Sequence, residues 1–208
     1  MPKELKSYLK LVRDLNESGK LRLYPGSPCC AAPLLREEDR MRLFELHPAD
    51  RRLLQKTFDE AGSKAIVLEQ DGFTGINAFL PPPTRRALVL IDPPYEIKTD
   101  YRTVLAALKE CLRRFATGTY VVWYPKLHSM QSRELPDKLK RLPITSWLHV
   151  SLDVRKPSDD GFGMHGSGLF VINPPWTLPA TLKKVMPYLV SVLGLDDGAT
   201  FTLEAEMP

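Results

Sequence analysis

The chain lacks most of the features that mark secreted, membrane-embedded or metal-binding proteins. Its 208 residues include only three cysteines, two of them adjacent, which fits neither a disulfide framework nor a paired Cys-x-x-Cys metal site. No apolar run reaches the roughly 18 residues of a membrane span, and no basic stretch followed by an apolar one opens the sequence. We therefore expect reduced cysteines, no bound metal, no membrane association and a cytoplasmic location.

A large excess of one charge is also missing, because 29 Lys and Arg face 25 Asp and Glu for a net charge of +4. The basic residues nevertheless form clusters, which are Arg85 with Arg86, Lys98 with Arg102, Arg113 with Arg114, and Lys138, Lys140 and Arg141. Each cluster alone is most simply a solvated helix face. Lys98 and Arg102 gain weight from their position, since they follow a candidate catalytic turn where a phosphate backbone would have to pass.

Short apolar runs alternate with helical patterns, which predicts a single α/β domain with a largely parallel sheet and right-handed βα units. The predicted helices are Leu5–Leu15, a stretch ending at Arg36, Ala49–Ala61, Tyr101–Phe115 and Thr181–Val192. The predicted strands are Arg42–Leu46, Ala65–Glu69, Ala87–Ile91, Thr119–Trp123, Trp147–Leu152 and Gly168–Ile172. Binding sites in such sheets lie at the carboxyl ends of the strands, so the residues that follow each strand are the first candidates.

The strongest chemical signal is the aliphatic strand Ala87–Ile91 followed by Asp92-Pro93-Pro94-Tyr95. This turn suits methylation of the exocyclic N6 amine of adenine. That amine is a poor nucleophile because its lone pair is shared with the ring. The Asp92 carboxylate and the Pro93 carbonyl can each accept one hydrogen bond from the amine and so direct its lone pair toward a methyl donor. The prolines restrict the turn in advance, and the Tyr95 ring offers a flat face for stacking on an unpaired base. Asp-Pro-Pro-Tyr alone is also an ordinary polar turn, so its context has to decide.

Two further strand ends carry residues suited to an adenosyl cofactor. Glu45 ends the Arg42 strand, where an acid commonly accepts hydrogen bonds from ribose hydroxyls. Asp71 and Gly72 follow the Ala65 strand, where a short acid can hold an adenine amine and glycine permits close approach of the backbone. A surface carboxylate and a simple Asp-Gly turn are the alternative interpretations of these two places.

Seven motifs occur in order along the chain. They are Leu23-Tyr-Pro-Gly-Ser-Pro28, Glu45-Leu-His-Pro48, Asp71-Gly-Phe73, Ile91-Asp-Pro-Pro-Tyr95, Thr99-Asp-Tyr101, Trp123-Tyr-Pro125 and Val171-Ile-Asn-Pro-Pro-Trp176. Together they resemble the RlmJ family of bacterial large-subunit ribosomal RNA adenine-N6 methyltransferases over essentially the whole chain. The resemblance implies a Rossmann-like class I fold, S-adenosylmethionine as cofactor, and a monomer acting on protein-free or partly assembled large-subunit ribosomal RNA.

The resemblance also implies roles for individual residues. Ser27, Glu45, Asp71, Gly72 and Asp92 are expected to contact the cofactor. Asp92 and Pro93 are expected to be catalytic, Tyr95 catalytic and base-stacking, and Lys98 substrate-binding. Asn173-Pro-Pro-Trp176 repeats the form of the catalytic turn, and we interpret it as a structural strand end with Trp176 packed nearby.

One departure from the family concerns the first residues. Relatives open with a first strand and a glycine loop that holds the methionine part of the cofactor, and this sequence contains neither. We therefore assign residues 1–24 to a remnant of the family's inserted helical subdomain and residues 25–208 to an N-terminally truncated methyltransferase domain. The expected sheet lacks its central strand, which would lie between the Arg42 and Ala87 strands. Weak cofactor binding is the expected consequence.

Two kinds of function follow. The first is an active ribosomal RNA methyltransferase. The second is an impaired remnant that only binds RNA through its basic patches, which predicts salt-sensitive binding without methyl transfer. Among enzymes, a DNA adenine-N6 methyltransferase is the rival, because it would share the catalytic turn.

Overall fold

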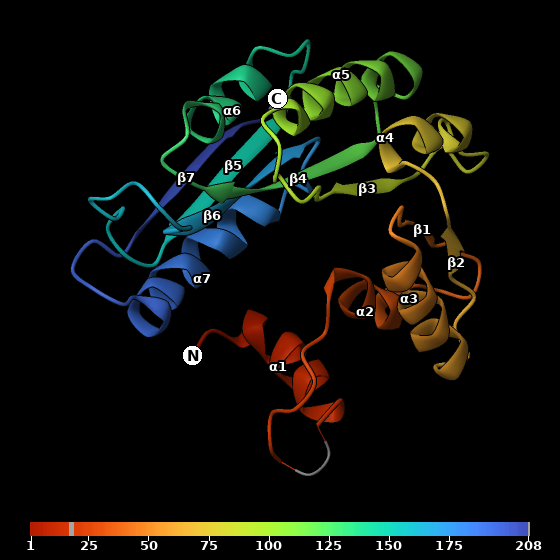
Figure 1. The fold of residues 1–208 in the computed structure, drawn as a ribbon, viewed down its shortest axis with the longest axis horizontal. Coiled ribbons are helices and arrows are strands. Elements are labelled where there is room, and N and C mark those ends of the chain that lie inside the picture. Colours follow the sequence, from red (N-terminus) through yellow and green to blue (C-terminus); the bar gives the residue numbers. More distant parts are fainter. Residues whose placement is uncertain (17–18, 208) are drawn as a thin grey trace. The chain divides into compact units, whose positions relative to one another are not determined.

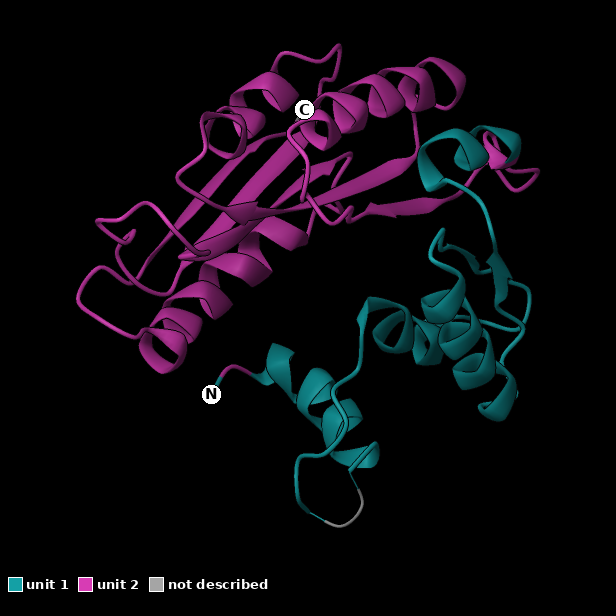
Figure 2. Cartoon of the chain, viewed as in Figure 1, with its two compact units in different colours: residues 1, 3–78 teal, residues 2, 79–208 magenta. Residues whose placement is uncertain are grey.

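A computed structural model describes residues 1–16 and 19–207, and it divides into two compact units (Figures 1 and 2). The first unit holds residues 1 and 3–78, and the second holds residues 2 and 79–208. The domain boundary assigned between residues 24 and 25 falls inside the first unit and stays a prediction. In the part of the chain that the structure describes, no helix is long and apolar enough to cross a membrane.

The first unit contains a two-stranded parallel sheet with helices before, between and after its strands. Its elements are η1 (Lys3–Leu5), α1 (Lys6–Asp14), α2 (Ser27–Ala31), η2 (Ala32–Leu34), β1 (Arg42–Phe44), α3 (Pro48–Glu60), β2 (Ile66–Leu68), α4 (Gly72–Gly75) and η3 (Ile76–Phe79). Strand β1 pairs with β2 from Arg42 opposite Ile66 to Phe44 opposite Leu68. Because α3 connects two parallel neighbours, β1, α3 and β2 form one βαβ unit.

The second unit is a five-stranded sheet in the order β3-β4-β6-β5-β7. Its elements are β3 (Leu88–Ile91), α5 (Thr99–Arg114), β4 (Thr119–Lys126), α6 (Met130–Lys140), β5 (Trp147–Asp153), β6 (Gly166–Ile172), α7 (Leu178–Leu193) and β7 (Thr200–Glu206). Helices α5 and α6 cover one face of the sheet and α7 covers the other (Figure 1). The result is a three-layered α/β unit, as the alternation of apolar runs and helical patterns predicts.

The expectation of a largely parallel sheet is wrong for most of this unit. Strands β3 and β4 are parallel, whereas β4 with β6, β6 with β5, and β5 with β7 are antiparallel. The reason lies in the connections. Residues 154–165 join β5 to β6 without a helix, so the chain returns in the opposite direction as a hairpin.

Successive side chains of a strand point to opposite faces of the sheet, so the sheet separates two apolar cores. On the side of α7, Leu148, Val150 and Val171 pack with Met186. On the side of α5 and α6, the fully buried residues include Tyr120, Val122, Phe170 and Ile172, which the register places on one face of β4 and β6. Strands β4 and β6 therefore contribute to both cores, and a shift of register by one residue would exchange their two faces.

A buried polar pair crosses the α5 and α6 side of the sheet. The Tyr124 hydroxyl lies 2.8 Å from His149 Nε2, and Gly168 lies opposite Tyr124 in the register. A Cβ at Gly168 would clash with the Tyr124 ring, so this position needs glycine. Burial lowers the pKa of His149, which favours the neutral imidazole.

The strands at Arg42 and Ala87 belong to separate sheets in the described structure. The central strand expected between them stays a prediction. Among the described residues, strand β3 pairs only with β4, and its outward side chains Leu88 and Leu90 are 68% and 43% exposed. Edge strands with apolar side chains are sites at which another segment or molecule can add.

All six predicted strands are confirmed, with ends that differ by up to three residues. Strand β7 and helix α6 were not predicted. In α6, Pro136 interrupts the helical pattern of the sequence. In β7, four threonine or glutamate positions alternate with Phe201, Leu203 and Ala205, and Phe201 and Leu203 pack toward α7 in the hydrophobic core.

Candidate functional site

The Asp92-Pro93-Pro94-Tyr95 turn directly follows the carboxyl end of β3. Ladder pairing with β4 ends at Ile91 opposite Val122, so the turn departs from the sheet at that point. The sequence places this turn where open α/β sheets hold their ligands, and the structure agrees.

Tyr95 anchors the turn to the neighbouring strand. Its hydroxyl donates to the carbonyl oxygen of Trp123 over 2.8 Å, one residue beyond the end of the ladder. Its ring lies 4.7 Å from that of Tyr101 and 6.4 Å from that of Trp123, centre to centre. Its backbone has φ of 53°, which a non-glycine residue adopts only at a cost that its surroundings must offset.

The structure does not present the Tyr95 ring as an open face for stacking. The residue is only 6% exposed, and burial raises the pKa of its hydroxyl. This differs from the sequence-based expectation because the hydroxyl, which the sequence cannot orient, directs the ring inward to a backbone carbonyl of β4.

Asp92 itself is exposed at the start of the turn. Partial burial of its carboxyl group raises its pKa above the ordinary value for aspartate. The structure thus leaves Asp92 open to an incoming molecule, while Tyr95 three residues later is fixed inside the second unit.

Glu45, Asp71 and Gly72 gather at the carboxyl edge of the β1–β2 pair in the first unit. Glu45 extends β1 by one residue, since its backbone N–H donates to the carbonyl of Leu68 over 3.1 Å. The Asp71 carboxylate caps α4 by accepting from the backbone N–H of Phe73 over 3.0 Å. The structure therefore brings these strand ends to one edge, while their contacts with a cofactor stay a prediction.

Phe44 fills the space beneath the start of α4. A Cβ at Gly75 would lie 2.6 Å from the Phe44 ring, and one at Gly72 would lie 3.2 Å from the Phe44 Cβ. The two glycines let α4 approach β1 closely. The Glu45 carboxylate uses Oε1 to accept from the backbone N–H of His47 over 2.7 Å, and Oε2 receives no hydrogen bond from the described residues.

Ser27 and Lys98 lie at helix starts. Ser27 is the first residue of α2 and is exposed. Lys98 lies three residues after Tyr95 and immediately precedes α5, and it too is exposed. Neither side chain makes a hydrogen bond or ion pair within residues 1–16 and 19–207. Both are therefore open to a ligand, and the contacts expected of them stay predictions.

The Asn173-Pro174-Pro175-Trp176 turn has the structural role that its sequence predicts. The Asn173 side-chain amide donates to the carbonyls of Ala116 and Gly118, each over 2.8 Å. Because β6 runs antiparallel to β4, this turn and Asp92 lie at opposite ends of the strands. The expectation that Trp176 packs nearby is wrong, since the residue is 84% exposed.

Sequence reasoning did not find a polar cluster at the carboxyl ends of β4 and β5. Lys126 Nζ lies 2.5 Å from Asp153 Oδ2, and His165 Nε2 lies 3.6 Å from Asp153 Oδ1. Burial lowers the pKa of His165. These residues are far apart in the sequence and come together only through the pairing of β4, β6 and β5, so no local pattern signals them.

The fold is Rossmann-like α/β, the class that the sequence predicts. A probable spermidine synthase from Corynebacterium glutamicum, 14% identical, superposes with a TM-score of 0.58 over 99% of this chain and 76% of its own, which shows the shared fold. The protein LPL1258 from Legionella pneumophila, 33% identical, superposes with a TM-score of 0.91 over 99% of this chain and 75% of its own.

The chain belongs to the RlmJ family. The family model described as ribosomal RNA large subunit methyltransferase D, RlmJ, matches residues 1–203. The ribosomal RNA large subunit methyltransferase J of Haemophilus influenzae is 44% identical over 98% of this chain and 72% of its own length. The protein of the same name from Escherichia coli is 46% identical over 93% of this chain and 68% of its own length.

Proposed function

We propose that the protein transfers a methyl group from S-adenosylmethionine to the N6 amine of an adenine in large-subunit ribosomal RNA. Membership of the RlmJ family supports ribosomal RNA as the substrate class. The Asp92 turn supports adenine N6 as the acceptor, because it offers two hydrogen-bond acceptors at the carboxyl end of a strand.

The acceptor chemistry rests on Asp92 and Pro93. The N6 amine donates one hydrogen bond to the Asp92 carboxylate and one to the Pro93 carbonyl, which turns the nitrogen lone pair out of conjugation with the ring. Proline at two successive positions limits the conformations of the turn before the base arrives. Little reorganisation is then needed as charge develops on the nitrogen.

Tyr95 serves this chemistry as a positioning residue. Its hydroxyl bond to the Trp123 carbonyl ties the end of the turn to β4, and the packing with Tyr101 holds the ring in place. The strained φ of 53° is maintained by these contacts. Loss of the hydroxyl should therefore disturb the Asp92 and Pro93 acceptors without removing either.

Residues of the first unit fit an adenosyl group by their chemistry. The second oxygen of the Glu45 carboxylate is open to ribose hydroxyls, and Asp71 with Gly72 lies beside it at the same strand edge. Ser27 would add a hydroxyl contact. When bound, S-adenosylmethionine supplies the electrophilic methyl group, and these side chains would hold and orient the adenosyl part of the cofactor.

The observation that carries the proposal is the Asp92-Pro93-Pro94-Tyr95 turn at the end of β3 in a chain of this family. The test supplies labelled methyl donor with unmodified large-subunit ribosomal RNA, followed by nucleoside analysis for N6-methyladenosine. Asp92→Ala should lower transfer by at least about a hundredfold. Glu96→Gln, which changes an exposed carboxyl near the turn, should retain it.

Parallel reactions separate the alternatives. Methylation of duplex DNA instead of RNA would identify a DNA adenine methyltransferase. Salt-sensitive RNA binding with no transfer to either substrate would identify an RNA-binding protein without this activity. Transfer to RNA that yields a methylated base other than N6-methyladenosine would contradict the role proposed for Asp92.

A further inference from the structure

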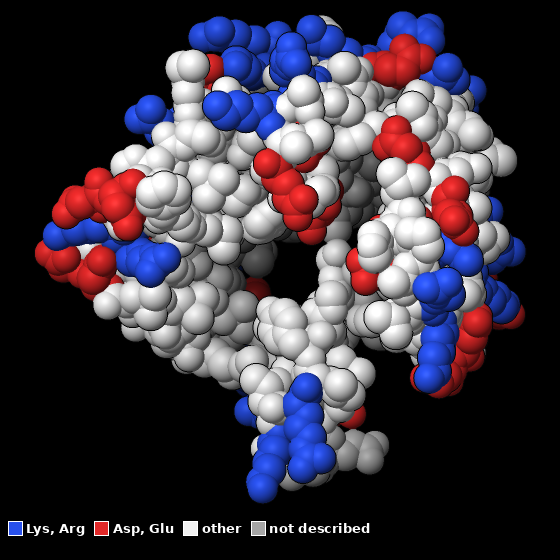
Figure 3. Space-filling model, viewed as in Figure 1, with Lys and Arg blue, Asp and Glu red and all other residues white. Residues whose placement is uncertain are grey.

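The net charge of the chain is concentrated on one helical layer. Residues 99–114 and 130–141, which form α5, α6 and the residue after α6, contain eight basic and four acidic side chains. The rest of the chain contains 21 of each sign. Figure 3 shows Lys and Arg side chains gathered where Figure 1 draws these two helices. The net charge of +4 therefore belongs to this layer, which we call the α5–α6 layer.

Helix α5 carries three of these charges as a stripe. Arg102, Lys109 and Arg113 follow one another by seven and four residues, so they share one face of the helix. All three are exposed, whereas the buried residues of α5, such as Val104 and Leu108, lie on another face. The stripe extends about 16 Å along the helix axis, and α5 begins four residues after Tyr95.

Ion pairs neutralise only part of the layer. Glu110 contacts both Arg113 and Arg114, at 2.7 Å and 2.6 Å, so one acidic group is shared between two basic groups. Lys109 and Arg141 form no salt bridge with any residue that the structure describes. Positive charge at these positions is therefore available to a partner.

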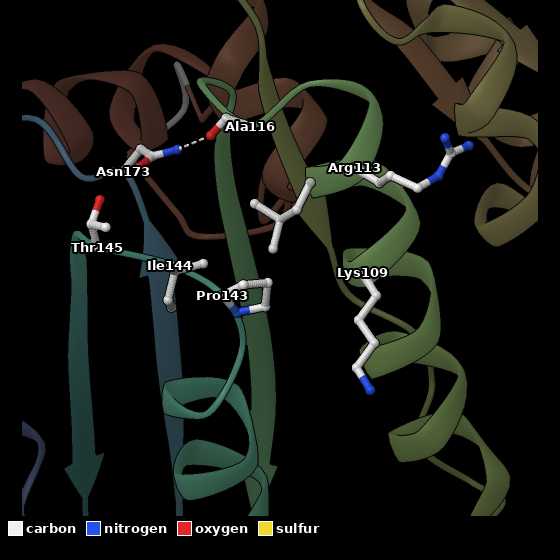
Figure 4. Close-up of a pocket in the computed structure, with 8 residues that line it drawn as sticks. Lys109, Arg113, Ala116, Pro143, Ile144, Thr145 and Asn173 are labelled. Atoms are coloured by element: carbon white, nitrogen blue, oxygen red, sulfur yellow. Dashed lines mark hydrogen bonds between the residues drawn. The ribbon is translucent and has the colours of Figure 1, made fainter.

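The layer is hollowed beside the stripe. A cavity of about 430 Å³ is lined by Lys109, Arg113 and the loop residues Pro143 to Thr145 (Figure 4). The Asn173 amide at its border is already occupied by the carbonyls of Ala116 and Gly118. The polar side chains that remain for a partner are cationic or hydroxyl groups, which suit phosphate oxygens.

We infer that the α5–α6 layer is a docking surface for the phosphate backbone of the substrate RNA. This inference rests on the proposed function for the identity of the substrate. Phosphate contacts release condensed counterions and fix the position of the RNA without reading its sequence. The layer therefore contributes affinity and orientation, while the turn at Asp92 receives the target base.

The test compares two double variants that each remove two positive charges from exposed helical or helix-end positions. Lys109→Ala with Arg141→Ala changes the layer. Lys183→Ala with Lys184→Ala is the matched control on α7, which covers the opposite face of the sheet (Figure 1). Equilibrium binding of an unmodified large-subunit ribosomal RNA transcript is measured without cofactor at several salt concentrations, after circular dichroism has confirmed folding.

The layer variant should bind more weakly at low salt, and its plot of log affinity against log salt should be shallower by about 1.4 to 1.8. The control should match the wild type. Equal slopes for the layer variant and the wild type would overturn the inference, as would equal losses in both variants or no RNA binding by the wild type. Because binding is measured directly, absence of methyl transfer would contradict the proposed function alone.

Discussion

Replacement of Tyr95 by phenylalanine distinguishes a role of the hydroxyl in anchoring the Asp92 turn from a role of the aromatic ring. The variant keeps the ring and removes only the hydroxyl that donates to the Trp123 carbonyl over 2.8 Å. A carbonyl left without its hydrogen bond away from water costs about 1–3 kcal/mol, and this one is partly buried, so we expect a loss of about 2 kcal/mol in the free energy of unfolding. For a chain of this size, that loss lowers the melting temperature by about 4–8 °C.

The assay has a structural and a kinetic part. Thermal unfolding gives the stability, with Tyr188→Phe on α7 as the matched loss of a hydroxyl. Methyl transfer gives kcat and KM separately. We expect Tyr95→Phe to lower kcat while KM for RNA stays unchanged, because the Asp92 and Pro93 acceptors lose their fixed position. A melting temperature and a kcat equal to those of the wild type would refute the anchoring role of the hydroxyl and would indicate that only the aromatic ring of Tyr95 matters.

Three further predictions concern pH and packing. Burial lowers the pKa of His149, so the unfolded state binds more protons than the folded state. The free energy of unfolding should therefore fall as the pH drops below about 6.5. The variant His149→Gln should show a weaker pH dependence in thermal melts. Gly168→Ala places a methyl group against the Tyr124 ring and should destabilise the fold by about 1–3 kcal/mol in denaturant titrations. Burial raises the pKa of Asp92, so kcat should decline on acidification at a pH above the ordinary aspartate range, as a rate profile would show.

The sequence predicted the half of the site that depends on local order. An unbroken aliphatic run identified β3, and the residues after it identified the turn, because strand and ligand edge are linked by chain direction. The strand ends at Glu45 and Asp71 followed from the same rule. Contacts across strands could not be predicted in this way.

Tyr95 and Trp176 illustrate the limit. Each follows a Pro-Pro pair, yet one is buried and the other is exposed. The Tyr95 hydroxyl donates to the Trp123 carbonyl of β4, whereas the Trp176 side chain makes no hydrogen bond with any residue that the structure describes. The directions of β6 and β7 were likewise set by connections and partners that no single segment contains.

The uneven placement of charge has a kinetic consequence. Within residues 79–208, the positions outside the α5–α6 layer carry eight basic and nine acidic side chains, so this unit has an electric dipole. In the field of a polyanion, such a dipole experiences a torque that turns the positive layer forward before contact. Encounters would then begin in a restricted set of orientations, and added salt would slow association by weakening this alignment.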